Sequence, residues 1–276
     1  MAIKDIIVVT DLNGEQPASQ VGVALAAREG AHATGLALAF EPIVPGFIAA
    51  PMPADFLQMA HDQAVSAAKK SLEKFDHYVK MAGISGETRT EEMVTGGSLD
   101  PVLRQARLTD MIVVGQDNPD DPEPMRELII EALLFDTGVP VMLVPYISKG
   151  EFAPKKVMIA WDGSATCARA VHAAMPMLEK ADDVNVVIVD KGKTFVGEPG
   201  ADIATYLARH NIEVNVQVIA NPQVSVSDAL LNYVSEQNMD LVVMGGYGTS
   251  RFREYILGGA TRDILSSMTV PVIMTH

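Results

Sequence analysis

Cysteine is almost absent from the sequence, and cationic residues are scarce. The single cysteine, Cys167, excludes an internal disulfide and fits a reducing compartment, so we expect a cytoplasmic location. Lys and Arg number 21 against 35 Asp and Glu, which gives a net charge of −14 at pH 7. Because nucleic acids and anionic membranes are bound through an excess of cations, we expect neither as a partner.

Long apolar runs are also missing. No segment approaches the ~20 apolar residues of a membrane span. The run of apolar residues after Asp5, Ile6–Val9, is too short for the core of a signal peptide. Hydrophobic residues nevertheless make up 48% of the chain and charged residues 20%, which is typical of a folded globular protein. A length of 276 residues fits one large domain or two modest ones.

The chain contains an internal repeat. Three segments of the first half recur in the second half in the same order: Ile6–Asp11 as Val157–Asp162, Asp110–Gly115 as Asp240–Gly245, and Val139–Met142 as Val270–Ile273. Repeats this long and this widely separated indicate duplicated domains rather than a short-period solenoid. We therefore expect one domain over residues 1–148 and a second over residues 153–276, with the join where Lys149-Gly150 and Pro154 interrupt any continuing pattern.

Each copy alternates short β-branched runs with helical patterns, which is typical of βαβ units around a buried parallel sheet. The pattern predicts an α/β fold of two tandem doubly wound domains, each a five-stranded, mostly parallel sheet flanked by four helices. The expected helices include Asp55–Ala82 and Arg253–Met268. Ligands of such sheets bind outside the carboxyl ends of the strands where the strand order reverses, so the loops after the first and fourth strands are the candidates.

A glycine-rich loop follows the fourth strand of the second copy. It runs from Gly245 to Thr261, with Gly248, Gly258 and Gly259 between them. Glycines free the turn that leaves the strand, and a glycine pair favours a helix start whose exposed N–H groups bind an anion. A flexible connection whose glycines only permit tight packing is the alternative.

This loop resembles the motif of the universal stress protein family, which reads Gly, two residues, Gly, nine residues, Gly, then Ser or Thr. The spacing of Gly245, Gly248 and Gly258 matches that motif. The resemblance implies that the loop wraps the phosphates and ribose of ATP, with or without Mg²⁺, and that an Asp after the first strand contacts the nucleoside. The implied nucleotide-binding residues are Trp161, Asp162, Gly245, Gly248, Gly258, Gly259, Ala260 and Thr261. Asp162 is equally suited to cap the helix that begins near Ser164.

The second copy departs from the family pattern at one position. Gly259 stands where nucleotide-binding members carry a Ser or Thr whose hydroxyl meets phosphate. The missing side-chain hydrogen bond is worth ~0.5–1.5 kcal/mol, so we expect ATP affinity to be about tenfold weaker.

The first copy departs much further. After Gly115 it reads QDNPDDPEP, which places four acids where phosphates would lie. Repulsion between like charges predicts that this copy rejects ATP, with Asp11 left as a remnant of the nucleoside contact.

Two functions fit these observations. The first is a stress-response protein that binds ATP in its C-terminal domain and acts as a non-catalytic sensor or regulator, with slow hydrolysis at most, because recognised catalytic motifs are missing. The second is a nucleotide-free dimerisation or interaction protein. In that reading the proline-rich apolar segment 41–53 covers an apolar ligand, or packs as a loop on the helix Asp55–Ala82.

Other chemistry has less support. The six histidines show no pair at metal-ligand spacing, so we expect no metal site. Cys167 is expected to be a buried small apolar residue rather than a nucleophile. The resemblance also implies that the two last strands, Val139–Pro145 and Val270–Thr275, pair to form an internal pseudo-dimer, and we expect chains to form a homodimer as well.

Overall fold

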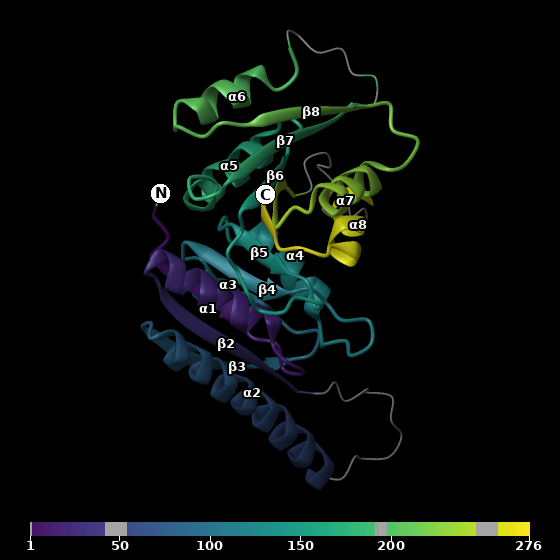
Figure 1. Ribbon diagram of the computed structural model, residues 1–276. Coiled ribbons are helices and arrows are strands. Elements are labelled where there is room, and N and C mark those ends of the chain that lie inside the picture. Colours follow the sequence, from purple (N-terminus) through teal and green to yellow (C-terminus); the bar gives the residue numbers. More distant parts are fainter. Residues whose placement is uncertain (1, 42–53, 191, 193–197, 247–258) are drawn as a thin grey trace. The chain divides into compact units, whose positions relative to one another are not determined.

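The computed structural model describes residues 2–41, 54–190, 192, 198–246 and 259–276 (Figure 1). Within these described residues, five strands alternate with four helices in each half of the chain, which confirms the predicted α/β fold. The elements are β1 Asp5–Val9, α1 Pro17–Glu29, β2 His32–Glu41, α2 Ala54–Ala82, β3 Gly86–Val94, α3 Asp100–Ala106, β4 Met111–Gly115, α4 Arg126–Asp136, β5 Val141–Val144, β6 Lys156–Ala160, α5 Ala165–Leu178, β7 Asp183–Asp190, α6 Ala201–Ala208, β8 Asn215–Ala220, α7 Val226–Gln237, β9 Leu241–Gly245, α8 Gly259–Ser267 and β10 Val272–Thr275.

The chain divides into two compact units. The N-terminal unit holds Ile3–Val139 and Tyr146–Glu151, and the C-terminal unit holds Pro140–Pro145 and Phe152–His276 together with Ala2. Strand β5, which the sequence repeat places in the first copy, therefore packs within the C-terminal unit. Among the described residues, no helix combines the length and apolar character needed to cross a membrane.

In the N-terminal unit the strand order is β3-β2-β1-β4, and all pairs are parallel. Right-handed crossovers place α1 and α2 on one face of the sheet and α3 and α4 on the other, and each of these helix pairs is in contact. The strand order reverses between β1 and β4. The loops after these two strands therefore meet at the carboxyl edge of the sheet.

Small residues on β2 let α2 lie close to the sheet. A Cβ atom added at Gly35 would lie 2.5 Å from the Cδ1 of Phe75, so the ring fills the space that a side chain would need. Further along, the methyl groups of Ala37 and Ala39 pack against Ala68 and Leu72 of the helix. Alternate β2 residues from 35 to 39 thus face α2.

In the C-terminal unit the strand order is β5-β10-β9-β6-β7-β8. Strand β10 runs parallel to β9 and antiparallel to β5, with Ile273 opposite Met142. The pairing predicted for the two last strands is therefore present. It covers an edge of β10 that would otherwise be open to uncontrolled strand addition.

One predicted helix is only partly covered by the description. We expected a helix over Arg253–Met268, and the described residues show α8 over Gly259–Ser267. Residues 253–258 of the prediction lie outside the described residues.

Candidate functional site

The candidate site lies at the carboxyl edge of the C-terminal sheet, where the strand order reverses between β6 and β9. The two strands are parallel, with Ala160 opposite Met244, so Trp161 and Gly245 lie at neighbouring strand ends. Helix α8 connects the end of β9 to the start of β10, which is parallel to β9, so the first turn of α8 lies at the same edge. Of the expected site residues, the structure brings five to this edge: Trp161, Asp162, Gly245, Gly259 and Thr261.

The remaining expected residues are not placed. Gly248 and Gly258 lie outside the described residues, and the side chain of Ala260 is not described. Thr261, in the first turn of α8, is buried, and Gly259 is exposed. The part of the expected site that the structure describes is therefore the end of β6, the end of β9 and the start of α8.

The turn between β6 and α5 is built by side-chain hydrogen bonds. The Oδ1 of Asp162 accepts a hydrogen bond of 2.9 Å from the backbone N–H of Ser164, and Gly163 between them has a φ of +76°. The hydroxyl oxygen of Ser164 accepts from the backbone N–H of Cys167 at 3.1 Å, so Ser164 is the N-cap of α5. The capping role considered for Asp162 belongs to Ser164, and Asp162 remains an exposed carboxylate at the strand end.

Gly245 is required by packing. A Cβ atom there would lie 2.5 Å from the Oγ1 of Thr166 and 2.7 Å from the backbone nitrogen of Cys167, so only glycine lets β9 end against the start of α5. The hydroxyl of Thr275 donates to the carbonyl of Thr166 at 2.7 Å and ties the same turn to β10. The packing interpretation thus accounts for this glycine without a ligand. At Gly259, by contrast, an added Cβ atom meets nothing within 4 Å.

Cys167 is buried at the start of α5, as expected from the sequence. Burial, reinforced by the nearby carboxylate of Asp162, raises the pKa of its thiol to about 12. The thiol donates a hydrogen bond to the carbonyl of Ala160 at 3.2 Å. A buried thiol with so high a pKa is protonated at neutral pH, as expected of a small apolar residue in the core.

The corresponding edge of the N-terminal sheet is occupied by the chain itself. The Oδ2 of Asp11 accepts from the backbone N–H of Ala18 at 3.1 Å, and its Oδ1 accepts from the Nη2 of Arg126 at 3.3 Å. The same Nη2 also pairs with the carboxylate of Glu123. The side chains of Arg126 and Asp11 are only 3% and 11% exposed, so this is a buried charge cluster.

The acid-rich loop after β4 is folded back onto this cluster. Glu123 accepts a hydrogen bond of 2.7 Å from the backbone N–H of Leu12, and its own N–H donates to Asp117 at 3.1 Å. A Cβ atom on Gly115 would lie 2.3 Å from the Oδ1 of Asp11, so the carboxylate fills the turn at the end of β4. The prediction from charge repulsion overlooked Arg126, which pairs with Glu123 of this loop and with Asp11. The sequence offers one indication of this role, because Arg126 is the first cationic residue after the acid-rich loop.

The pH dependence of stability should report on this cluster. Burial raises the pKa of the Asp11 carboxyl from 3.8 to about 6, with Arg126 opposing the rise and Glu123 adding to it. Because the folded-state pKa is raised, the stability that the protonated acid provides is complete below about pH 4 and is lost as the pH rises through about 6.

We therefore expect an Asp11→Asn variant, which cannot ionise, to lack this loss. Between pH 5 and pH 7 the free energy of unfolding of the wild type should fall by about 1 kcal/mol more than that of the variant. Urea titrations at several pH values measure the difference. Identical pH profiles would contradict the assignment.

Comparison with known proteins identifies the class to which the C-terminal unit is similar. Residues 154–276 match the family model described as Universal stress protein family. The curated relative Universal stress protein Slr1230 of Synechocystis is 28% identical over 124 residues, which cover 43% of this chain and 41% of that protein. The match therefore spans less than half the length of the curated relative.

Solved structures resemble the chain over nearly its whole length. A crystal structure of a universal stress protein from Archaeoglobus fulgidus has a TM-score of 0.72 at 18% identity, with 98% of this chain and 95% of that chain covered. A structure of a protein of unknown function from Pseudomonas aeruginosa PAO1 has a TM-score of 0.58 at 13% identity, with 99% and 92% covered. At these identities the likeness establishes the fold. A universal stress protein domain is thus matched in sequence by residues 154–276, and the N-terminal half is matched in fold.

Proposed function

We propose that the C-terminal domain, residues 153–276, binds ATP at the carboxyl edge of its sheet and that the chain acts in the stress response as a non-catalytic, nucleotide-dependent sensor or regulator. The observation that carries the proposal is the convergence of three features at one edge. They are the exposed carboxylate of Asp162, the end of β9 at Gly245, and the first turn of α8 at Gly259 to Thr261.

The chemistry of this edge suits an anionic nucleotide. The backbone N–H groups in the first turn of a helix have no partner within the helix and carry a partial positive charge, which favours phosphate. Gly259 presents these groups without a side chain in the way, since nothing lies within 4 Å of the position of its missing Cβ. Asp162 lies across the reversal point from α8 and supplies an acceptor for a nucleoside hydroxyl or amino group.

The N-terminal domain, residues 1–148, is proposed to leave ATP unbound. Arg126 pairs with Asp11 where a nucleotide would have to enter, and both side chains are buried. A ligand would need to break this pair and leave two unpaired charges in the protein interior, which solvates them poorly. The expected stoichiometry is therefore one ATP per chain.

Calorimetric titration of the full chain with ATP and Mg²⁺ tests the proposal. Asp162→Ala should weaken binding by roughly 10- to 100-fold, the value of a hydrogen bond to a charged group. Gly259→Ser should strengthen binding by up to about tenfold, because it adds the hydroxyl that the family motif carries. Open space at residue 259 accommodates the new side chain.

Two matched variants serve as controls. Asp182→Ala removes an exposed acid before β7, at the opposite edge of the sheet, and should leave the affinity unchanged. Gly259→Ala changes the helix start without adding a hydroxyl and should not strengthen binding. Absence of binding up to millimolar ATP in the wild type and in Gly259→Ser would overturn the proposal. A nucleotide-free interaction protein would then be the better account. Of the segment 41–53, which would cover an apolar ligand in that account, residues 42–53 lie outside the described residues.

A further inference from the structure

A group of potential metal ligands lies in the N-terminal unit, where strand β2 ends. Alternate residues of β2 face α2, and Glu41 continues the series of Gly35, Ala37 and Ala39 by one more step. On the neighbouring strand Glu92 is in register with Ala39, so its side chain lies on the same face. Two carboxylates therefore meet helix α2 at the end where its apolar contact with the sheet stops.

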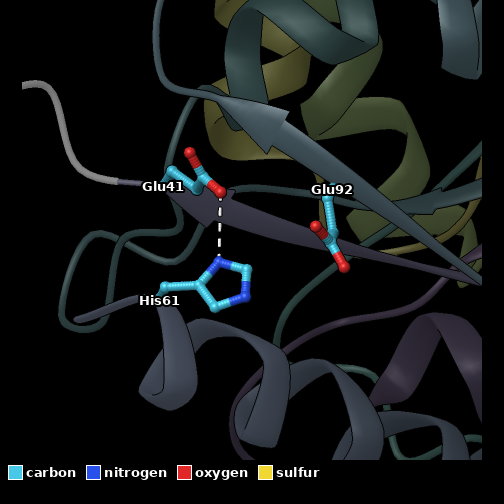
Figure 2. A group of neighbouring side chains, drawn as sticks. All are labelled: Glu41, His61 and Glu92. Atoms are coloured by element: carbon cyan, nitrogen blue, oxygen red, sulfur yellow. Dashed lines mark hydrogen bonds and ion pairs between the residues drawn. The ribbon is translucent and has the colours of Figure 1, made fainter. Parts of the chain in front are cut away.

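Helix α2 places an imidazole opposite these carboxylates. Its contact residues Ala64, Val65, Ala68 and Leu72 recur at helical spacing, and His61 lies one turn before the first of them on the same stripe. The Nδ1 of His61 is 3.0 Å from the Oε1 of Glu41. One ligand atom from each of Glu41, His61 and Glu92 lies within 4.8 Å of the other two, and Figure 2 shows the three side chains around one space.

The backbone that carries these groups is held in place. The carbonyl of Glu41 accepts hydrogen bonds from both the backbone N–H and the hydroxyl of Thr95, at 3.2 and 2.7 Å. His61 and Glu92 lie within α2 and β3 rather than in loops. Ligands carried by regular elements need little rearrangement to close around an ion.

The charges of this group call for a cation. A hydrogen bond between His61 and Glu41 accounts for two of the three residues. Within the described part of the chain, no Lys or Arg pairs with either Glu41 or Glu92, and no hydrogen bond reaches the Glu92 carboxylate. Two carboxylates facing one imidazole therefore leave negative charge that a bound ion would neutralise.

We propose that Glu41, His61 and Glu92 bind a divalent transition-metal ion, Zn²⁺ first among them, as a structural link between β2, β3 and α2. One imidazole with two carboxylates is a set that Zn²⁺ accepts, whereas Mg²⁺ and Ca²⁺ prefer oxygen ligands alone. Zn–N and Zn–O bonds of about 2.0–2.2 Å place tetrahedral ligand atoms about 3.5 Å from one another. The three ligand atoms now lie within 4.8 Å of one another, so side-chain rotations that bring them closer by little more than about 1 Å would close the site. Water completes the coordination.

Zinc titration of the full-length chain tests this proposal. The chain, free of any histidine tag and stripped with a chelator, is titrated with Zn²⁺ against a chromophoric competitor in the absence of nucleotide. We expect one tight site per chain, abolished in His61→Gln and weakened at least ~tenfold in Glu92→Gln. Because the ion binds only the folded unit, Zn²⁺ should also raise the unfolding temperature of the wild type and not that of His61→Gln.

Two histidine variants are matched controls. His77 is exposed on the same helix. In the C-terminal unit the ring of His210 lies against that of Tyr206, with the centroids 4.8 Å apart and the ring planes tilted by 54°. His77→Gln and His210→Gln should bind Zn²⁺ like the wild type. Unchanged Zn²⁺ affinity in His61→Gln and Glu92→Gln, or no stoichiometric binding in the wild type, would overturn the proposal. Glu92 is exposed, so Glu92→Gln should fold normally and keeps the test valid even if His61→Gln does not fold. The outcome does not depend on whether ATP binds.

Discussion

Replacing Arg126 with methionine is expected to lower the free energy of unfolding of the N-terminal unit by about 3–5 kcal/mol. The guanidinium is buried and pairs through Nη2 with both Asp11 and Glu123. Methionine fills similar volume but leaves two carboxylates buried without a cation. Denaturant unfolding followed by circular dichroism measures the loss.

The control for this prediction is Arg104→Met. Arg104 is exposed on α3, so its replacement should change the free energy of unfolding by no more than about 0.5 kcal/mol. The double variant Arg126→Met with Asp11→Asn should lose less free energy of unfolding than the two single variants lose together. The reason is that Asp11→Asn removes one of the two carboxylates that Arg126→Met leaves buried without a cation. Additive effects would show that Arg126 acts through packing alone and would contradict the charge cluster.

Replacing Phe75 with alanine is expected to lower the free energy of unfolding by a similar amount, about 3–5 kcal/mol. Phe75 has 0% of its surface exposed, and its ring lies on Gly35 between α2 and β2. Removal of the ring leaves a cavity that β2 cannot fill, because the facing residues are glycine and alanine. Thermal and urea unfolding give the measurement, and Met81→Ala on the same helix, at a side chain 75% exposed, is the neutral comparison.

A double-mutant cycle isolates the contact between ring and glycine. Gly35→Ala alone should destabilise the unit by about 1–3 kcal/mol, because the new methyl group would clash with the ring at 2.5 Å. In the Phe75→Ala background the same methyl group enters the vacated space and should be tolerated. If Gly35→Ala is equally costly in both backgrounds, backbone conformation rather than the ring requires glycine there.

The order of strands and helices could be predicted from the sequence because each buried strand is a short apolar run between turn residues. The run Met111–Gly115, for example, is completely buried and reads as a strand without any knowledge of its neighbours. The pairing of β5 with β10 could be expected only through the family resemblance. No local pattern states which strand covers another.

The candidate sites were less accessible to sequence reasoning. Asp162 was placed correctly at a strand end because its position follows directly from that of the strand. Arg126 was missed because its partner Asp11 lies 115 residues away in the sequence. Glu41, His61 and Glu92 were missed for the same reason, since no short spacing links residues that come together only through strand register and the packing of α2. The expectation of no metal site rested on short spacings alone.

The position of β5 suggests why both copies have been retained in one chain since the duplication that the sequence repeat indicates. The N-terminal copy has a filled site, yet its last strand lies in the C-terminal unit and covers the edge of β10. Deletion of the first copy would uncover that edge and expose the second copy to self-association. The loops of the first copy can therefore diverge while the copy itself is retained, because its last strand protects the sheet edge of the second copy.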